Sequence, residues 1–252
     1  MQNSQQFTAV TESRLAFLIA GIWVLALCLP ALLWLPSQTP TTNNAPIRQS
    51  YRQVWQTLKT LPQRPPLLKF LIGFYLISSV IVTLNNFLGI YLTTQFGLTL
   101  AQILQYGVLF NLVPIPATIF FGFLGDRLSA HQILYSLLLL WVIAITIMVF
   151  STNPSTPLVL AILLGLVFGS TQAFCRGWFA RLIQINQATE LFGFNALAGR
   201  LAAILGPLLF GVISSLTGDQ RLAIGLLVLF LGSGAMLLSQ VPSDKVIQQF
   251  SP

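Results

Sequence analysis

The fold is decided by residues 165–211, which read GLVFGSTQAFCRGWFARLIQINQATELFGFNALAGRLAAILGPLLFG. Two apolar segments flank a short polar loop, and four charged residues lie in or beside them: Arg176, Arg181, Glu190 and Arg200. Only 7% of the chain is charged, so arginines inside apolar segments are unusual here. A charge at membrane depth is costly and usually faces a bundle interior or a water-filled path. This stretch therefore predicts a helical membrane protein with a polar interior.

The composition of the whole chain favours the same class. The chain has 252 residues, 55% of them hydrophobic, whereas a soluble domain would carry about 25% charged residues. The net charge of +7 comes from basic residues in short loops between apolar segments, which is the pattern of the positive-inside rule rather than of a nucleic-acid-binding face. Cys28 and Cys175 lie in apolar segments and are predicted to be small core residues. His131 is the single histidine, so we expect no metal site and no cofactor.

Seven apolar segments are about long enough to cross a ~30 Å hydrocarbon core as helices. They are residues 15–35, 67–92, 103–124, 132–150, 157–180, 191–215 and 221–241. Short loops join the last six, so neighbouring helices should pack antiparallel. The predicted organisation is an N-terminal tail (1–14), a first transmembrane helix (15–35), a loop (36–66), a six-helix bundle (67–241) and a C-terminal tail (242–252). The predicted fold class is therefore an all-α multi-pass membrane protein with seven transmembrane helices.

The loop at residues 36–66 contains a pattern typical of an amphipathic helix. Ile47, Tyr51, Trp55 and Leu58 follow helical spacing between residues 47 and 61, and basic residues lie off that stripe. One interpretation is a helix lying on the membrane surface. The other is a solvated helix that packs on the bundle, and the pattern does not decide between them.

The distribution of basic residues predicts the orientation in the membrane. If the loop 36–66 is cytoplasmic, most basic residues lie at or near the cytoplasmic face: Arg48, Arg52, Lys59, Arg64, Lys69, Arg127, Arg176, Arg181 and Lys245. The outer face then keeps only Arg14 and Arg221. The positive-inside rule therefore predicts an external N-terminus and a cytoplasmic C-terminus. We expect an integral protein of a bacterial plasma membrane, whose first partner is the lipid bilayer.

A loop motif follows the third span. Gly122, Asp126 and Arg127 match the first half of G-x-x-x-D-[RK]-x-G-[RK]-[RK], and here the sequence resembles the major facilitator superfamily. Residues 129–131, Ser-Ala-His, stand where that family has glycine and basic residues. The resemblance implies that Asp126 caps a helix and pairs with basic groups across the cytoplasmic face. The alternative is a helix end with a simple loop ion pair.

Three segments extend the resemblance. FCRGWFARLI (174–183), LFGFNALAGR (191–200) and LGPLLFG (205–211) are similar to the vacuole effluxer branch of the superfamily, which includes fungal autophagy-related vacuolar amino-acid effluxers and bacterial relatives. The resemblance covers nearly the whole chain. Family members have twelve helices, so it implies that 15–35 corresponds to the sixth helix, 36–66 to the central cytoplasmic loop, and the remaining spans to helices seven to twelve. The chain would then be the second half of a transporter.

The acidic residues give a departure from the family. Relatives often carry Asn-Asp-Gly near the middle of the seventh family helix, where this chain has Ser78-Ser79-Val80. Asp126 and Glu190 lie at span ends, so no carboxylate lies well inside a span. Proton coupling usually needs a titratable group at depth. Either the coupling residues lie in the other half, or the protein does not couple to protons in this way.

Arginines are the first candidates for substrate or gating residues. Arg200 lies between apolar and small residues, and we expect it to face a central cavity, where it could bind an anionic substrate group or a carboxylate of the other half. The alternative is an arginine that reaches to the headgroups. Arg176 is a candidate for a gating ion pair with Glu190 or Asp126, although anchoring at the cytoplasmic face is favoured for both Arg176 and Arg181.

Uncharged polar residues inside the spans are the other candidates. Each needs a hydrogen-bond partner in hydrocarbon, and bonding between helices is the alternative role. We predict as cavity residues Asn85, Asn111, Gln172 and Asn195. The small pairs Gly165/Gly169 and Gly199/Ala203 predict close helix contacts. Helix breaks are predicted at Pro114, Pro116 and Pro207.

These observations predict a major facilitator type transporter that moves a small solute by alternating access, and the resemblance implies an amino acid as one such solute. We expect a truncated or split-gene half that needs a separate N-terminal half or a second copy. The alternative is a non-transporting membrane subunit or an inactive fragment. No nucleophile–base pair or phosphate-binding loop is present, so an enzyme is not expected. A retinal protein is excluded because no lysine lies in the middle of a span.

Overall fold

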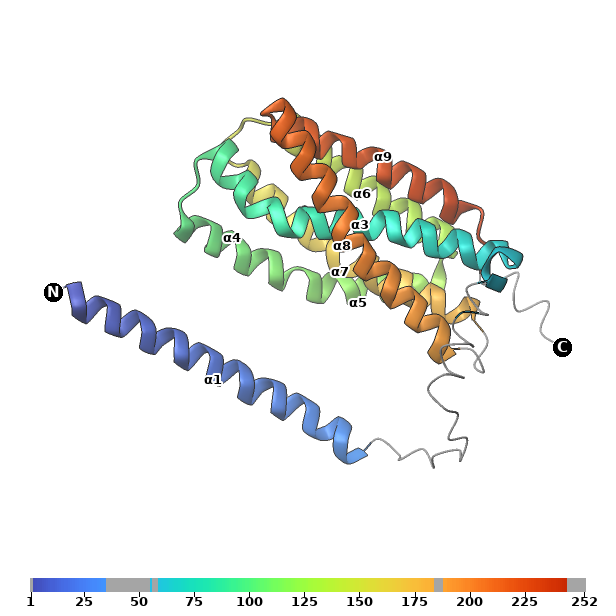
Figure 1. The fold of residues 1–252 in the computed structure, drawn as a ribbon, viewed down its shortest axis with the longest axis horizontal. Helices are drawn as coiled ribbons and strands as arrows, with labels where there is room; N and C mark the ends of the chain where they lie inside the picture. Colours follow the sequence, from blue (N-terminus) through green and yellow to red (C-terminus); the bar gives the residue numbers. More distant parts are fainter. Residues whose placement is uncertain (1, 35–54, 56–58, 184–187, 244–252) are drawn as a thin grey trace. The chain divides into compact units, whose positions relative to one another are not determined.

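The computed structural model describes residues 2–34, 55, 59–183 and 188–243 (Figure 1). The chain divides into two units, Met1–Tyr51 and Arg52–Pro252, and each is described by itself.

The first unit contains one described helix, α1 (Gln2–Trp34). It begins before the predicted span at residues 15–35 and continues through Pro30 without ending. Its apolar stretch, Phe17–Pro30, is shorter than the ~20 residues that usually cross a bilayer. The large apolar side chains described in α1, such as Leu25 and Leu32, are exposed within this unit. A membrane crossing by α1 stays a prediction.

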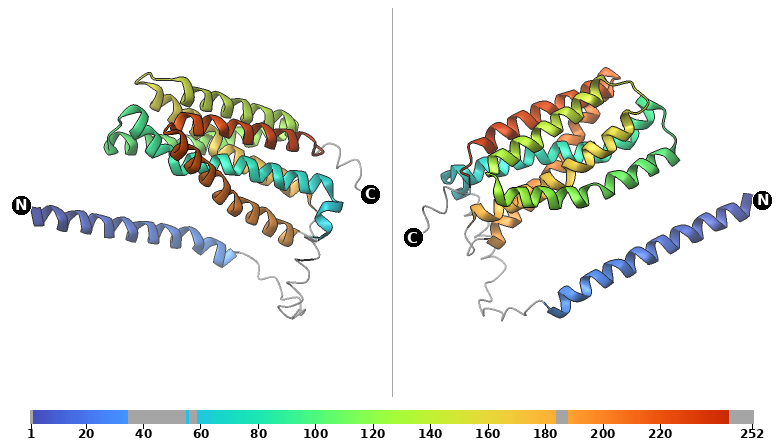
Figure 2. Two further views of the ribbon diagram at one scale, coloured as in Figure 1. Left: turned by 45° about the horizontal axis from the view of Figure 1, so that its top comes forward. Right: turned by 180° about the vertical axis from the view of Figure 1, so that it is seen from behind.

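The second unit is a bundle of helices (Figures 1 and 2). Its elements are the 3-10 turn η1 (Leu61–Gln63) and the helices α3 (Pro65–Phe96), α4 (Leu100–Leu112), α5 (Pro114–Arg127), α6 (Ala130–Phe150), α7 (Thr156–Leu182), α8 (Ala188–Thr217) and α9 (Gln220–Ser239). With α4 and α5 counted together, six described helices are long and apolar enough to cross a membrane by length and composition. The predicted fold class is confirmed: the chain is an all-α multi-pass membrane protein.

Two predicted parts fall wholly or mostly outside the described residues. Of the predicted amphipathic helix at residues 47–61, the structure describes only Trp55 and residues 59–61. There the Lys59 Nζ atom lies 5.6 Å from the centre of the Trp55 ring. Of the predicted C-terminal tail, only Pro242 and Ser243 are described.

The helix ends follow from local sequence. Thr99 and Ser129 begin α4 and α6 with capping boxes, in which the hydroxyl accepts from the backbone N–H three residues on and a glutamine side chain accepts from the cap N–H. Gly97 and Gly218 follow α3 and α8 with φ of 63° and 69°, a left-handed conformation that glycine adopts without steric cost.

Prolines interrupt one span and leave another intact. Because Pro114 has no backbone N–H, the third span breaks there into α4 and α5, as predicted. The break predicted at Pro207 is wrong, because α8 continues through it from Ala188 to Thr217. Proline is tolerated inside transmembrane helices, although it removes one backbone hydrogen bond.

The core of the bundle lies around α3, which packs against α7, α8 and α9. Phe70, Val80 and Tyr91 of α3 are fully buried. The Phe70 ring lies 5.5 Å from the Trp178 ring, edge to face, and 5.1 Å from the Phe179 ring. These aromatic contacts join α3 to α7 where both approach their ends.

The bundle has two ends, which we name the Arg221 end and the Asp126 end after residues in their loops. At the Arg221 end, the Arg221 guanidinium donates to Gln95 Oε1 at 3.0 Å, to Val149 O at 3.3 Å and to Ser151 O at 3.2 Å. These bonds tie α9 to α3 and to the end of α6. The Tyr91 hydroxyl also donates to the backbone oxygen of Met148, which joins α3 to α6 near the same end.

At the Asp126 end, two polar connections join described side chains. The Arg181 Nη2 atom lies 3.8 Å from Asp126 Oδ1, and both side chains are more than half exposed. Lys69 Nζ donates to Gln240 Oε1 at 2.8 Å and so connects the start of α3 to the end of α9. Exposed polar pairs of this kind contribute little to stability.

One predicted close helix contact is confirmed. A Cβ atom on Gly165 would lie 2.9 Å from Val113 Cβ, and one on Gly169 would lie 2.9 Å from Thr118 Oγ1. Both distances are too short for a real Cβ, so α7 meets the α4–α5 break only because these positions are glycine.

The other predicted close contact, at Gly199 and Ala203 of α8, lies farther along the helix than predicted. A Cβ atom on Gly199 would meet nothing nearer than Phe74 Cε1 at 3.9 Å, so the prediction for the Gly199/Ala203 pair is wrong for Gly199. The tight contact is at Gly206, where a Cβ would overlap Thr83 Oγ1 and the backbone oxygen of Ser79 on α3. The backbones of the two helices therefore approach more closely at Gly206 than at Gly199.

Candidate functional site

A cavity of about 420 Å³ lies between α3, α7 and α8 in the half of the bundle nearer the Asp126 end. Four of the six predicted substrate or gating residues line it: Gln172, Arg176, Asn195 and Arg200. The remaining lining residues are Phe74, Ser78, Val82, Phe192, Ala196 and Gly199. The structure therefore brings most of the predicted polar residues into one place.

Helical spacing explains how three helices supply this lining. Gln172 and Arg176 are four residues apart on α7 and so lie on one face of it. On α8 the same spacing joins Asn195 to Gly199, and Arg200 follows directly. The absence of a side chain at Gly199 leaves the space that a larger residue would fill.

The two arginines make the cavity positive. Arg176 and Arg200 are exposed in the isolated bundle, and neither has a hydrogen bond or ion pair among the described residues. No lining residue is acidic. Arg200 lies twelve residues into α8, roughly 18 Å along the helix axis at 1.5 Å per residue. Two guanidinium groups therefore stand in the cavity without a counter-charge from its lining.

Asn195 adds a hydrogen-bond acceptor. Its side chain is 6% exposed, and its Oδ1 atom is buried without a partner among the described residues. Buried polar atoms in proteins nearly always have a partner, so an orphan of this kind points to a ligand, a water or a missing protein group. Together the cavity can offer donors to an anion and an amide oxygen to a cation.

Asn85 and Asn111 lie elsewhere. Asn85 lines a separate pocket of about 130 Å³ between α3, α4 and α7, together with Tyr106 and Pro157. Asn111 Nδ2 donates to the backbone oxygen of Gly107 at 2.8 Å, within its own helix. That bond satisfies part of the hydrogen-bonding need that made Asn111 a candidate.

Some lining residues were not predicted. In the sequence, Ser78 belongs to the segment that stands where relatives carry Asn-Asp-Gly, and it was not predicted as a site residue. In the structure its side chain is 6% exposed and lines the cavity. Phe74, Ser78 and Val82 recur every four residues on α3. A serine between two apolar residues on one helix face could have indicated that this face lines a partly polar cavity.

The loop motif forms a different arrangement. Asp126 pairs with Arg181, not with Arg176, which was the candidate for a gating pair. The helix cap at the start of α6 is Ser129, rather than Asp126. Arg127, the last residue of α5, follows Asp126 and is exposed.

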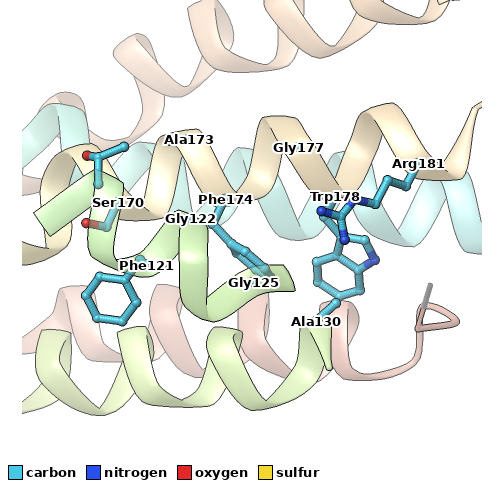
Figure 3. Close-up of a pocket in the computed structure, with 11 residues that line it drawn as sticks. Phe121, Gly122, Gly125, Ala130, Ser170, Ala173, Phe174, Gly177, Trp178 and Arg181 are labelled. Carbon is cyan, nitrogen blue, oxygen red and sulfur yellow. The ribbon is translucent and has the colours of Figure 1, made fainter. Parts of the chain in front are cut away.

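A third pocket lies next to Arg181 of this ion pair (Figure 3). It has a volume of about 190 Å³ between α5, α7 and the start of α6. Gly122 of the motif lines it, together with Gly125 and Arg181. In Figure 3 the aromatic side chains of Phe121, Phe174 and Trp178 stand in the space between these helices.

Comparison with known proteins assigns the chain to a family. A family model described as "Vacuole effluxer Atg22 like" matches residues 1–251. The chain is 28% identical to an uncharacterized MFS-type transporter, YxiO, of Bacillus subtilis, over 92% of this chain and 54% of the relative. It is 24% identical to autophagy-related protein 22 of Cryptococcus neoformans, over 92% of this chain and 46% of the relative.

A third relative, autophagy-related protein 22 of Eremothecium gossypii, is 26% identical over 87% of this chain and 47% of its own length. The chain thus spans about half the length of the curated relatives it matches. No solved structure matches the chain. From the family match over nearly its whole length, the chain belongs to the vacuole effluxer Atg22-like family.

Proposed function

We propose that this chain forms one half of a membrane transporter that moves a small, carboxylate-bearing solute by alternating access. The observation that carries the proposal is the cavity of about 420 Å³ with Arg176 and Arg200 in its lining. A fixed charge inside a membrane protein is costly to keep, and it commonly marks a substrate or ion path. The family match and the six apolar helices support transport as the setting for this cavity.

The chemistry of the lining favours a zwitterionic solute such as an amino acid. A guanidinium group can donate two parallel hydrogen bonds to a carboxylate, which gives both strength and orientation. The unpartnered Oδ1 of Asn195 can accept from an ammonium group. Phe74 and Phe192 offer apolar surface for a side chain. Each part of an amino acid therefore has a matching group in the cavity.

The proposed second half would close the cavity from the side that this chain leaves open. Alternating access in such folds is a rocking of two helical bundles around a site near the midplane. The relatives are about twice as long as the matched region, which supports a second bundle of comparable size as the partner. A separately encoded half and a second copy of this chain are the two forms that the partner could take.

The orientation of the bundle is part of the proposal. We infer that the Asp126 end faces the cytoplasm, because Arg127, Arg181 and Lys69 lie at that end. The cavity would then be accessible from the cytoplasmic side in this conformation. A bacterial plasma membrane is the location that we propose.

The test is transport by the reconstituted protein. This chain is co-expressed with the part of the Bacillus subtilis relative that it does not match, and purified complexes are placed in liposomes loaded with an unlabelled amino-acid mixture. Counterflow of labelled leucine and of its decarboxylated amine, isoamylamine, is then measured. We expect uptake of the amino acid, uptake of the amine at least about tenfold slower, and no uptake by this chain alone.

The variant Arg200→Gln should lower amino-acid uptake by about thirtyfold, equivalent to about 2 kcal/mol, because a charge-assisted bond to the carboxylate is lost. Equal uptake of acid and amine, or an unchanged rate in Arg200→Gln, would contradict the proposed substrate class. A complex that assembles and retains bound amino acid but moves none would favour a non-transporting membrane subunit.

A further inference from the structure

We propose that the pocket between α5, α6 and α7 at the Asp126 end binds a phosphodiester group, of the kind that anionic phospholipids carry. This site is separate from the solute cavity and does not depend on the proposed transport function. It is the pocket of about 190 Å³ shown in Figure 3. That volume is several times the ~30 Å³ that one water occupies in the liquid, so it can admit a headgroup-sized ligand.

Two of the polar groups that line this pocket, on Trp178 and Arg181, can only donate, and its hydroxyl groups can donate or accept. The side chains of Ser170 and Trp178 are 1% and 2% exposed, and Ser170 Oγ and Trp178 Nε1 have no hydrogen-bond partner among the described residues. The indole N–H can only donate. Leaving such groups unpaired in a buried setting is costly, so an acceptor is expected beside them.

The charge of the pocket favours an anionic acceptor. Arg181 lines it and supplies a guanidinium group, and no acidic side chain is part of its lining. Asp126 pairs with Arg181 from outside the lining, at 3.8 Å, with 73% of its side chain exposed. Such an exposed pair is weak, so a phosphate can share or replace it. Guanidinium and phosphate also match in geometry, because two N–H groups meet two oxygens.

The position of the pocket favours a lipid as the source of the phosphate. Arg181 is one residue from the end of α7, at the level where a spanning helix reaches the headgroups. Basic pockets between transmembrane helices on the cytoplasmic side are typical headgroup sites. On α5, beside the pocket, Ile119, Phe120 and Phe123 are exposed and offer apolar surface for an acyl chain.

The two sites use different faces of α7. The proposed phosphodiester pocket is lined by Ser170, Ala173 and Gly177 of α7. The solute cavity is lined by Gln172 and Arg176 of the same helix. A helix advances by about 100° per residue, so the two sets lie well apart around the axis. Variants in one site can therefore be made without changing the lining of the other.

Gly177 offers a direct way to fill the pocket. It lines the pocket, and a Cβ atom built on it meets no heavy atom within 4 Å. Gly177→Leu should therefore fold, because leucine favours the helix and enters open space. Gly232→Leu on α9 is the matched control, since Gly232 is equally open and lies outside the pocket.

The experiment is native mass spectrometry of the purified chain in neutral detergent, titrated with short-chain phosphatidylglycerol or phosphatidylcholine. We expect phosphatidylglycerol to bind about tenfold more tightly, because the choline cation of phosphatidylcholine offsets the charge of its own phosphodiester. Gly177→Leu and Arg181→Gln should each weaken phosphatidylglycerol binding by about tenfold. Gly232→Leu and Arg127→Gln should bind like the wild type. Asp126→Asn should bind phosphatidylglycerol at least as tightly, because a competitor for Arg181 is removed.

Equal binding of the two lipids, or wild-type binding by both Gly177→Leu and Arg181→Gln, would overturn the proposal. A second titration with glycerol 3-phosphate separates the possible sources. Displacement of phosphatidylglycerol by glycerol 3-phosphate at similar concentration would support the phosphate site and reject a lipid as its source. No displacement, with the variant pattern above, would support the lipid.

Discussion

Two regions of the contact between α3 and α8 differ sharply. Toward the Arg221 end the helices are in close contact, with Gly206 against α3 and the Phe87 and Phe210 rings 4.3 Å apart. Toward the Asp126 end the same helices line a cavity whose lining includes Asn195 and Arg200. Figure 1 shows α8 crossing α3 at an angle. One helix pair thus forms a closed contact and an open cavity, and the size and polarity of a few residues decide which.

The arginines of the two regions differ in the same way. Arg221 donates to three partners on α3 and α6 and so uses its hydrogen-bonding capacity on the fold itself. Arg200 has no partner among the described residues. The comparison teaches that an arginine in this bundle is structural where the protein supplies its acceptors, and available to a ligand where it does not.

The largest expected effect tests the closed contact. Gly206→Ala should destabilise the bundle by about 3 kcal/mol, because the new Cβ would lie 3.0 Å from the carbonyl carbon of Ser79 and overlap its oxygen, and backbone cannot move aside cheaply. The measurement is the thermal unfolding midpoint in detergent. Gly199→Ala is the matched control on the same helix, where the nearest atom is 3.9 Å away, and it should change stability by less than about 0.5 kcal/mol. Similar effects at both glycines would show that the two regions are packed alike.

The next effect separates the two arginines. Arg221→Gln should cost about 1.5 kcal/mol of stability, because it leaves the acceptors on Gln95, Val149 and Ser151 without their donor at a half-buried position. Arg200→Gln should leave stability within about 0.5 kcal/mol of the wild type, since it removes no bond among the described residues. The unfolding midpoints of the two variants are compared directly. A greater loss in Arg200→Gln would mean that Arg200 is structural.

The sequence predicted the spans well and the details of contact less well. Long apolar segments bounded by polar loops predict helices because the bilayer sets their length and composition. Helix α3 accordingly contains the predicted span 67–92, and α7 contains 157–180. Polar residues inside such segments also predicted a site, because they are costly in hydrocarbon, and four of them line one cavity.

What the sequence could not predict depends on how helices are rotated and where they cross. Asn111 and Asn195 look alike in sequence, yet Asn111 bonds its own helix at Gly107 while Asn195 lines the cavity. Gly199 and Gly206 are both small residues on α8, and the crossing point with α3 decides which one is in contact. The pairing of Asp126 with Arg181 rather than Arg176 likewise follows from the relative rotation of α5 and α7.

A smaller effect sharpens this distinction between asparagines. Asn195→Ala should raise the KM for transport by about fivefold, equivalent to about 1 kcal/mol, because an amide acceptor is lost from the cavity. Asn111→Ala should leave KM unchanged, because its side chain bonds to Gly107 of its own helix. Both are measured by counterflow in the co-expressed complex. A larger rise in KM for Asn111→Ala would place the substrate near α4 and not in the α3–α8 cavity.

The smallest effect concerns the ion pair at the Asp126 end. Asp126→Asn should change the free energy of unfolding by less than about 0.5 kcal/mol, because the pair spans 3.8 Å between two exposed side chains and water screens it. The measurement is again the thermal unfolding midpoint in detergent. The small residual effect should vanish at 1 M salt, where the screening length falls to about 3 Å. Arg221→Gln, in contrast, should keep most of its cost at high salt, because its partners include neutral carbonyl oxygens at hydrogen-bonding distance. If Asp126→Asn cost as much as Arg221→Gln, both ends would be held equally firmly. The cavity between α3 and α8 would then reflect only the local side chains around it, and not a difference in polar connections between the two ends of the bundle.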